Sequence, residues 1–534
     1  MEKNMNTLRE ELLQELPEFE RKTKQFIQKE ISMKEYKGYS GGFGSYAQRG
    51  GEAFMLRLRM NQGRITKEKL KFIIDQCQEH GIVRTHCTTC QTVQLHDVRL
   101  EALTPIMKEA LERDIVTRGG GGDYPRNVMC SVLSGLEASG CSFVNVSSFV
   151  GTYIFFIINA FDVYAYAKVA GEYLLSIVNK YSLPRKLKVA FSNSKANEVH
   201  ANFRDLGFIA NTDHTFDVYC CGGLGNNPMM GVKVGNHIDP KDILYYINTM
   251  VLMFMEHGDY KNRAKARSRY LQMSLGKDRI VEEFHEKVEL AKKYLDHDVH
   301  VEDVVIQKEG KELDVIPDRV IKQKQSGLYA VKYHPLCGNM SLDKWKELYD
   351  VVQDMDEVEL RLTPQEDIYI VNLNGNEVQK VLEHTQDGAH TTFETSVSCI
   401  GASTCQVGLR DSNNVLKSLI EALRPYEFKE GVLPRVYISG CPSSCGTNQI
   451  GAIGLQGFTK LVDKKPYSAF KMSVNGSSDL EDTQFGKEVG LILESDINDF
   501  FIELGTLVSN ANATFENWQK ENADQWQALL DKYL

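Results

Sequence analysis

Four cysteines near the end of the chain have the number and spacing that could bind a metal centre. Cys399 and Cys405 are separated by five residues, and after 35 more residues Cys441 and Cys445 are separated by three. Four thiolates suit a cubane iron–sulfur cluster, because each iron at a corner takes one thiolate ligand. A structural zinc site also takes four cysteines, but its paired cysteines are usually two residues apart. The spacing therefore favours a cluster and leaves zinc as the alternative.

The residues around the second pair of cysteines carry a resemblance to a known family. They read Tyr437-Ile-Ser-Gly-Cys-Pro-Ser-Ser-Cys-Gly446, which is similar to the cluster motif of the sirohaem-dependent sulfite and nitrite reductases. The resemblance implies that Cys399, Cys405, Cys441 and Cys445 hold a [4Fe–4S] cluster. It also implies that Cys445 bridges this cluster to the iron of a bound sirohaem.

Four basic residues stand where the family binds its anionic substrate: Arg57, Arg126, Lys186 and Lys188. On a strand, the spacing of the two lysines puts both ammonium groups on one face. Two like charges that lie together lower each other's pKa, which makes one lysine a better proton donor. Arginine stays charged and can hold anion oxygens in its planar fork. Each residue alone would be interpreted as a solvated surface charge, so their catalytic role is implied by the resemblance.

Six residues match family positions that contact sirohaem: Thr88, Gln91, Gln94, Arg263, Arg267 and Arg269. The chain departs from the family at His86 and Cys90, which stand in place of two arginines that pair with sirohaem carboxylates. Cys87 and Cys90 could instead bind a metal or act as a redox pair. We prefer the interpretation that they are a tolerated replacement.

A duplication in the sequence predicts the fold that would bring these residues together. Residues 54–112 and 328–385 each show the pattern of strands and helices of a ferredoxin-like half. Two such units predict a pseudo-twofold domain built by duplication. The resemblance to the reductase family implies the rest of the fold: an α+β molecule in which duplicated ferredoxin-like half-domains flank α/β domains that bind sirohaem and the cluster.

Five segments are predicted: an N-terminal helix and glycine-rich arm (1–46), the first ferredoxin-like half (47–118), an α/β substrate and sirohaem domain (119–326), the second half (327–396) and a [4Fe–4S]/sirohaem domain (397–534). Single helices are predicted over residues 264–275 and 515–534.

The composition limits the compartment and the partners. A net charge of −10 argues against nucleic acid. Twelve cysteines are too few for a disulfide scaffold, and the start Met1-Glu-Lys-Asn shows no signal peptide. We therefore expect reduced thiols and a cytoplasmic location. Residues 141–161 are apolar over about 20 residues, but they contain polar side chains and no basic flank, so we expect strand and not a membrane span.

The resemblance implies an oxidoreductase that reduces sulfite to sulfide, with nitrite as a further substrate. Lys188 favours sulfite, because plant-type nitrite reductases tend to have asparagine there. The electrons would come from an external ferredoxin or flavoprotein. The alternatives are a ferredoxin-type nitrite reductase, a corrinoid-pathway monooxygenase of the same fold, which Lys186 and Lys188 argue against, and a non-catalytic cluster or zinc protein.

Overall fold

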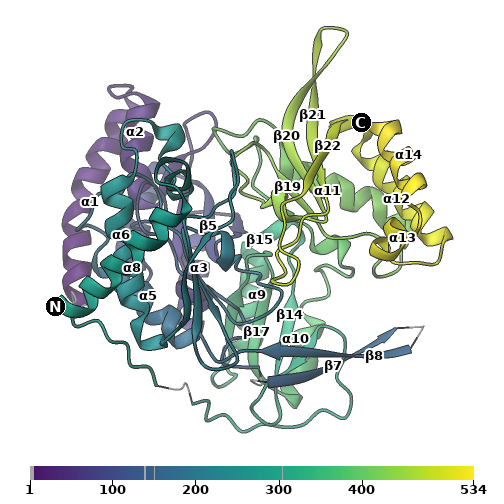
Figure 1. Ribbon diagram of the computed structural model, residues 1–534, viewed down its shortest axis with the longest axis horizontal. Helices are drawn as coiled ribbons and strands as arrows, with labels where there is room; N and C mark the ends of the chain where they lie inside the picture. Colours follow the sequence, from purple (N-terminus) through teal and green to yellow (C-terminus); the bar gives the residue numbers. More distant parts are fainter. Residues whose placement is uncertain (1–4, 138–139, 149–150, 303–304) are drawn as a thin grey trace.

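The computed structural model describes residues 5–137, 140–148, 151–302 and 305–534 (Figure 1). The first four residues, on which the prediction of no signal peptide depends, lie outside this part. So do residues 149–150 of the apolar stretch.

Two five-stranded sheets confirm the predicted duplication of ferredoxin-like halves. The strands of the first sheet are β1 (Ser45–Ala47), β2 (Phe54–Arg59), β5 (Thr92–Val98), β4 (Arg84–Cys87) and β15 (Asn339–Ser341). Those of the second are β13 (Val320–Lys322), β14 (Leu328–Tyr333), β17 (Ile368–Asn374), β16 (Glu359–Leu362) and β3 (Arg64–Ile65). Each half lends one short strand to the other's sheet, since β3 pairs with β16 and β15 pairs with β4. The two halves are therefore interlocked and share one core.

Equivalent turns start both exchanged strands. Gln62 and Gly63 have positive φ of 54° and 75°, and Cys337 and Gly338 have 58° and 68°. A Cβ on Gly63 would lie 2.6 Å from the carbonyl oxygen of Leu362. The turn therefore requires glycine for its conformation and for the close approach of the partner strand.

Four helices cover these sheets: α3 (Lys67–Glu79), α4 (Leu100–Leu111), α9 (Leu342–Val352) and α10 (Gly375–Glu383). Three of them begin at capping residues that the sequence supplies. Thr66 and Ser341 accept hydrogen bonds from the third backbone N–H that follows each of them, and Asn374 forms a capping box with Glu377.

A second pair of five-stranded sheets shows that the duplication continues beyond the ferredoxin-like halves. One sheet has β6 (Met129–Cys130), β9 (Val189–Ser192), β10 (Leu206–Ala210), β11 (Phe216–Cys220) and β12 (Val232–Ile238). The other has β18 (Val397–Ser398), β19 (Val436–Ser439), β20 (Ile453–Val462), β21 (Lys465–Val474) and β22 (Lys487–Leu493). In each, the first three strands are parallel and the last two are antiparallel.

The turns of these two sheets match residue by residue. Val189 pairs with Leu206 as Val436 pairs with Ile453. After β9, Asn197 and His200 have positive φ, and after β19 Ser444 and Thr447 do so at the same spacing. In this alignment Glu198 occupies the position that Cys445 occupies in the second sheet.

The other helices pack around the sheets. They are α1 (Met5–Ile27), α2 (Met33–Ser40), α5 (Tyr164–Ser176), α6 (Ile243–His257), α7 (Leu271–Ser274), α8 (Lys277–Tyr294), α11 (Ser412–Leu423), α12 (Ile497–Asn510), α13 (Phe515–Glu521) and α14 (Ala523–Tyr533). In Figure 1, α1, α6 and α8 form one flank and α12 to α14 form the opposite one. Helix α1 buries Leu8, Leu12, Leu16 and Phe19, the apolar face that its sequence predicts.

Two predicted helices are wrong in extent. The segment 264–275 contains two 3₁₀ turns and only the short α7. Its helix is interrupted because Arg267 and Ser268 turn inward and hydrogen-bond the buried carboxylate of Asp205. The segment 515–534 breaks at Asn522, and the break lets Trp518 and Trp526 meet edge to face with 6.4 Å between ring centroids.

The apolar stretch forms a hairpin. Strands β7 (Gly140–Ser148) and β8 (Gly151–Asn159) pair antiparallel along their whole length and make a sheet of two strands, which confirms the prediction of strand. Figure 1 shows this ribbon projecting from the body of the molecule. Within the described residues, no helix has both the length and the apolarity needed to cross a membrane.

Candidate active site

The four cysteines gather at one end of the C-terminal sheet. Cys399 directly follows β18, and Cys441 and Cys445 follow the neighbouring parallel strand β19. The carboxyl ends of parallel strands share one edge, so these loops meet. The sulfur of Cys399 accepts a hydrogen bond from the backbone N–H of Gly440 at 3.2 Å. Burial and the neighbouring Cys445 raise the pKa of Cys399 to about 12.

The arrangement of the thiols fits a cluster better than zinc. One zinc ion at ~2.3 Å from each sulfur would hold its four ligand atoms within ~4 Å of one another. In the described part of the chain, no three of these sulfurs come within 4.8 Å of one another. Amide donation to a cluster thiolate, as Gly440 gives to Cys399, is one of the interactions that tune such a cluster.

Two of the predicted substrate residues are held by a run of glycine carbonyls. Arg57 on β2 donates to the carbonyl of Gly120 at 2.7 Å. Arg126 donates to Gly120 at 3.0 Å and to Gly122 at 2.8 Å. A Cβ on Gly121 would lie 2.4 Å from the carbonyl oxygen of Gly41, so this run packs against the earlier glycine-rich loop. The glycines therefore position the two arginines.

The two predicted lysines lie on one face, as their spacing indicated. Leu187 between them pairs with Pro125 and is buried, whereas Lys186 and Lys188 are half-buried. Burial lowers the pKa of both lysines, and for Lys186 the nearby Arg267 and Lys188 lower it further. The ammonium group of Lys188 donates to the sulfur of Cys90 at 3.3 Å.

Arg57 and Arg126 are held by neutral carbonyls, so no carboxylate compensates their positive charge. Burial lowers the pKa of Arg126 to about 10 and that of its neighbour Arg59 to about 9. The buried Nε atoms of Arg57, Arg126 and Arg267 have no hydrogen-bond partner. Unpaired buried donors of this kind are costly unless an acceptor reaches them. A bound anion and a carboxylate-rich macrocycle are the kinds of ligand that fit these donors.

Three arginines are predicted to meet sirohaem. Arg267 and Arg269 lie beside the loop that carries Cys441 and Cys445, here called the cluster loop, and Arg263 does not. Arg269 donates hydrogen bonds to the carbonyls of Asn226 and Asn227. The neighbouring Gly225 exchanges two hydrogen bonds with Gln449, which follows Cys445 in the chain. Arg267 forms an ion pair with Asp205 at 3.0 Å.

Arg263 instead forms an exposed ion pair with Asp123 at 2.6 Å, and its side chain is 62% exposed. It is therefore already neutralised at the surface.

Of the three polar residues predicted to contact sirohaem, Thr88 and Gln91 shape the turn between β4 and β5, and Gln94 lies on β5. The amide of Gln91 donates to the carbonyls of Cys130 and Leu362 and accepts from the N–H of Cys130. The hydroxyl of Thr88 bonds that of Thr92, and Gln94 bonds His96. Thr89, which follows Thr88 in this turn, contacts the cluster loop, because its hydroxyl donates a hydrogen bond to the backbone carbonyl of Cys445 at 2.9 Å.

Sequence reasoning missed two buried residues of the site, Arg204 and Asp205. Asp205 is fully buried and accepts from the backbone N–H of Lys188 and from Arg267. Arg204 lies close enough to Cys90 to lower the pKa of its thiol. Their sequence, which only introduces a strand, contains no signal for this role.

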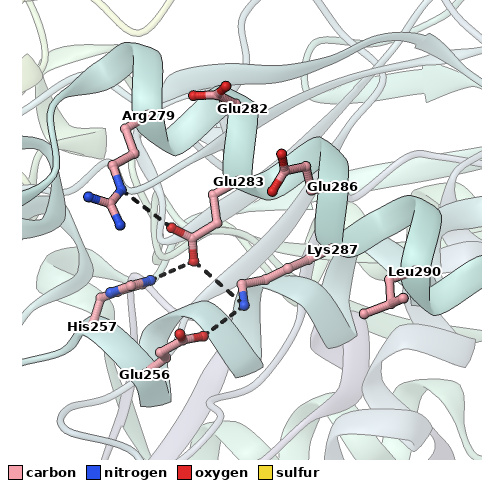
Figure 2. Close-up of a pocket in the computed structure, with 8 residues that line it drawn as sticks. All are labelled: Glu256, His257, Arg279, Glu282, Glu283, Glu286, Lys287 and Leu290. Atoms are coloured by element: carbon pink, nitrogen blue, oxygen red, sulfur yellow. Dashed lines mark hydrogen bonds and ion pairs between the residues drawn. The ribbon is translucent and has the colours of Figure 1, made fainter.

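A surface hollow between α6 and α8 is a different kind of feature (Figure 2). His257 lies 2.5 Å from Glu283, and Lys287 pairs with Glu256 and Glu283. His257 and the two glutamates could hold a cation, but Lys287 already supplies the positive charge, and no predicted site residue lines this hollow.

Comparison with protein families gives two matches. The description "Nitrite and sulphite reductase 4Fe-4S domain" matches residues 121–293. The description "Nitrite/Sulfite reductase ferredoxin-like half domain" matches residues 46–113 and 321–387. Together they cover more than half of the chain. Arg126, Lys186 and Lys188 lie inside the first match, and the four cysteines lie after both.

Individual relatives include reductases for both anions. A ferredoxin–nitrite reductase of Leptolyngbya laminosa is 24% identical over 79% of this chain and 80% of its own length. A sulfite reductase [NADPH] hemoprotein beta-component of Staphylococcus saprophyticus is 23% identical over 76% of this chain and 74% of its own.

The solved structure of the Mycobacterium tuberculosis NirA protein has the same fold, with a TM-score of 0.71, 21% identity and coverage of 92% of this chain and 91% of that one. The matched 4Fe-4S domain and these relatives imply a [4Fe–4S] cluster and sirohaem as cofactors.

Proposed function

The chain belongs to the nitrite and sulfite reductase family, and on this premise we propose that it reduces sulfite to sulfide, with nitrite as a second substrate. Cys399, Cys405, Cys441 and Cys445 would hold the [4Fe–4S] cluster, and Cys445 would also be the ligand shared with sirohaem. When bound, sirohaem supplies an iron that binds the anion and takes electrons relayed by the cluster.

One observation carries this proposal, the group of half-buried cations beside the loops that carry the cysteines. Lys186 lies near enough to Cys445 for the two charges to affect each other, and the same holds for Lys188. Arg57 and Arg126 are held by carbonyls, so their charge is available to an anion. A concentration of fixed positive charge next to a redox centre is what a small oxyanion needs.

The two lysines would supply protons as well as charge. Reduction of sulfite to sulfide consumes protons with each pair of electrons, and burial lowers the pKa of Lys186 and of Lys188. A lysine with a lowered pKa gives up its proton more readily near neutral pH. Arg57 and Arg126 would keep the oxygens of the anion in place while this happens.

The sirohaem carboxylates would be met by Arg267 and Arg269. Both arginines have a buried nitrogen without a partner. Thr88 and Gln91 would act indirectly, because their hydrogen bonds fix the β4–β5 turn, whose Thr89 contacts Cys445. Gln94 would act from β5, where it bonds His96.

Electrons would come from a separate donor, a ferredoxin or a flavoprotein, in a reducing compartment such as the cytoplasm. The names of the relatives include both ferredoxin and NADPH types. For this chain we therefore propose an external redox protein as the electron donor.

The substrate preference can be tested at Lys188. Protein purified without oxygen would be supplied with a chemically reduced viologen, and the formation of sulfide and of ammonia would be measured. We expect turnover of both anions, and we expect Lys188→Asn to lower sulfite turnover about 10-fold more than nitrite turnover. Lys188→Arg, which keeps the charge, is the matched control. Equal losses on both substrates would contradict the selectivity role, and no turnover of either anion would contradict the proposed function.

A further inference from the structure

Cys90 lies inside the positive site and contacts a residue proposed to bind substrate. Its side chain is half-buried, and its sulfur is the hydrogen-bond acceptor of the Lys188 ammonium group at 3.3 Å. Its backbone carbonyl is fixed by the side-chain amide of Asn127 at 3.2 Å. The thiol is therefore held against the lysine by the fold.

Four cations from four parts of the chain face Cys90. They are Arg57 on β2, Arg126 before β6, Lys188 before β9 and Arg204 before β10. Behind them, Asp205 accepts from the backbone of Lys188, and His200 lies 3.1 Å from Arg204. Burial alone would raise the pKa of the Cys90 thiol, but Lys188, Arg204 and Arg57 lower it to about 6.

A thiolate and a substrate anion would compete for the same ammonium group. The thiolate carries one negative charge at the position where an anion would meet Lys188. A second negative charge at that distance is strongly repelled in a site of low dielectric constant. Protonation of the sulfur removes the repulsion and frees the lysine.

We propose that the Cys90 thiolate is the counter-ion of Lys188 in the anion-free site, and that an anion which binds Lys188 displaces it, so that Cys90 takes up one proton as the anion binds. The proton comes from solvent and forms the S–H bond, and no electron moves in this step. Sulfite and nitrite are the anions only if the proposed function holds; the Cys90–Lys188 pair does not depend on it.

The pair can be tested by the reactivity of Cys90. The rate of its alkylation by iodoacetamide would be followed by mass spectrometry of the Cys90 peptide from about pH 5 to about pH 9 in the anaerobically purified holoenzyme. We expect half-maximal rate near pH 6, compared with about 8.5 for an ordinary cysteine. Cys87 lies in the same peptide but is fully buried, and burial raises its pKa far above this range, so it should stay unmodified.

Variants separate the contact from the general positive charge. Lys188→Met should move the midpoint of alkylation up by about two pH units, and Lys188→Arg should leave it low. Lys186→Met is the matched control, because Lys186 lies in the same site but does not hydrogen-bond Cys90, and it should move the midpoint much less. A wild-type midpoint near 8.5, or the same midpoint in Lys188→Met, would overturn the pair.

Proton uptake is measured with sulfate, whose charge is constant over this range. Calorimetry at about pH 7 in two buffers of different ionisation enthalpy should give close to one proton taken up per sulfate bound, and none in Cys90→Ala. Sulfate should also raise the midpoint of Cys90 alkylation. Sulfate binding without proton uptake would overturn the proposal. If these results hold while neither sulfite nor nitrite is reduced, the proposed function fails and this inference stands.

Discussion

Arg57 and Arg126 are half-buried cations that the protein fixes without neutralising them. Their partners are the carbonyls of Gly120 and Gly122, which supply a hydrogen bond but no full negative charge. A carboxylate partner would position each arginine equally well and would cancel its charge. Carbonyl partners therefore keep the charge for a ligand.

Removal of one of these charges should weaken the binding of anions. Arg126→Met should lower kcat/KM for sulfite by about 30- to 150-fold, because a charge-assisted hydrogen bond of ~2–3 kcal/mol is lost. Arg113→Met is the control, since Arg113, just after α4, forms an exposed ion pair with Glu109, and it should change kcat/KM by less than about twofold. Equal effects of the two variants would contradict the assignment of Arg126.

The sequence predicted which residues form this site better than it predicted the contacts between them. The spacing of Lys186 and Lys188 is sufficient to place both on one face, because alternation along a strand is a local property. The contact between Lys188 and Cys90 joins residues 98 positions apart, and the ion pair of Arg267 and Asp205 joins residues 62 apart. Contacts of this kind depend on packing, and no local pattern encodes them.

At the scale of elements, the exchanged strands lock the two ferredoxin-like halves together. Strand β3 has two residues and β15 has three, so neither has enough alternation to be recognised as a strand in the sequence. The strands that were predicted, such as β17, are long and apolar, with seven residues. The duplication was therefore predictable and the exchange was not.

The turn before β3 should be sensitive to a single methyl group. Gly63→Ala forces an alanine to φ +75° and places its Cβ 2.6 Å from a backbone oxygen of the partner half. We expect a loss of about 3 kcal/mol of stability, measured as a lower midpoint of thermal unfolding. Gly81→Ala is the matched control, because φ is +64° there and nothing lies within 4 Å; it should cost about 1 kcal/mol. An equally small effect at Gly63 would contradict the close packing.

The β7–β8 ribbon should be dispensable for the cofactor site. Among the residues that the structure describes, its strands pair only with each other. Replacement of residues 141–158 by a short Gly-Ser turn should leave the iron content and the visible spectrum of the purified protein unchanged. Loss of iron on deletion would show that the ribbon supports the site.

At the scale of the whole molecule, the duplication produces two related centres with different charges. The strand pairing aligns the two repeats of the molecule. In this alignment Lys332 is the counterpart of Arg57, and Arg435 is the counterpart of Lys188. In the second centre Lys332 lies 3.2 Å from the buried Asp367, and Glu198 and Asp367 both interact with Arg435. Carboxylates thus neutralise the second centre, whereas the first keeps its positive charge.

The ion pairs of the second centre should contribute to stability in a pH-dependent way. Burial would raise the pKa of Asp367, but Lys332, His334 and Arg435 outweigh it and hold the pKa well below its usual range. This stabilisation is present above the unfolded pKa of about 3.9 and is lost as the pH falls below it. Asp367→Asn should therefore cost about 3 kcal/mol at neutral pH.

The difference between wild type and Asp367→Asn should stay constant down to about pH 4 and shrink as the pH is lowered from about 4 toward about 2, as measured by thermal unfolding. Asp482→Asn, at an exposed position, is the control and should change stability by less than about 0.5 kcal/mol at every pH. A difference that stays constant with pH would contradict the ion-pair account.

The central claim is that one cysteine joins an iron–sulfur cluster to sirohaem beside a positively charged site. Its most direct test is the iron content and absorption spectrum of the protein purified without oxygen, with Cys445→Ser measured in parallel. The account predicts about five irons per chain, four in the cluster and one in the macrocycle, an isobacteriochlorin-type spectrum, and loss of spectral coupling between the two centres in Cys445→Ser. Zinc in place of iron, or coupling that survives the Cys445→Ser change, would contradict it.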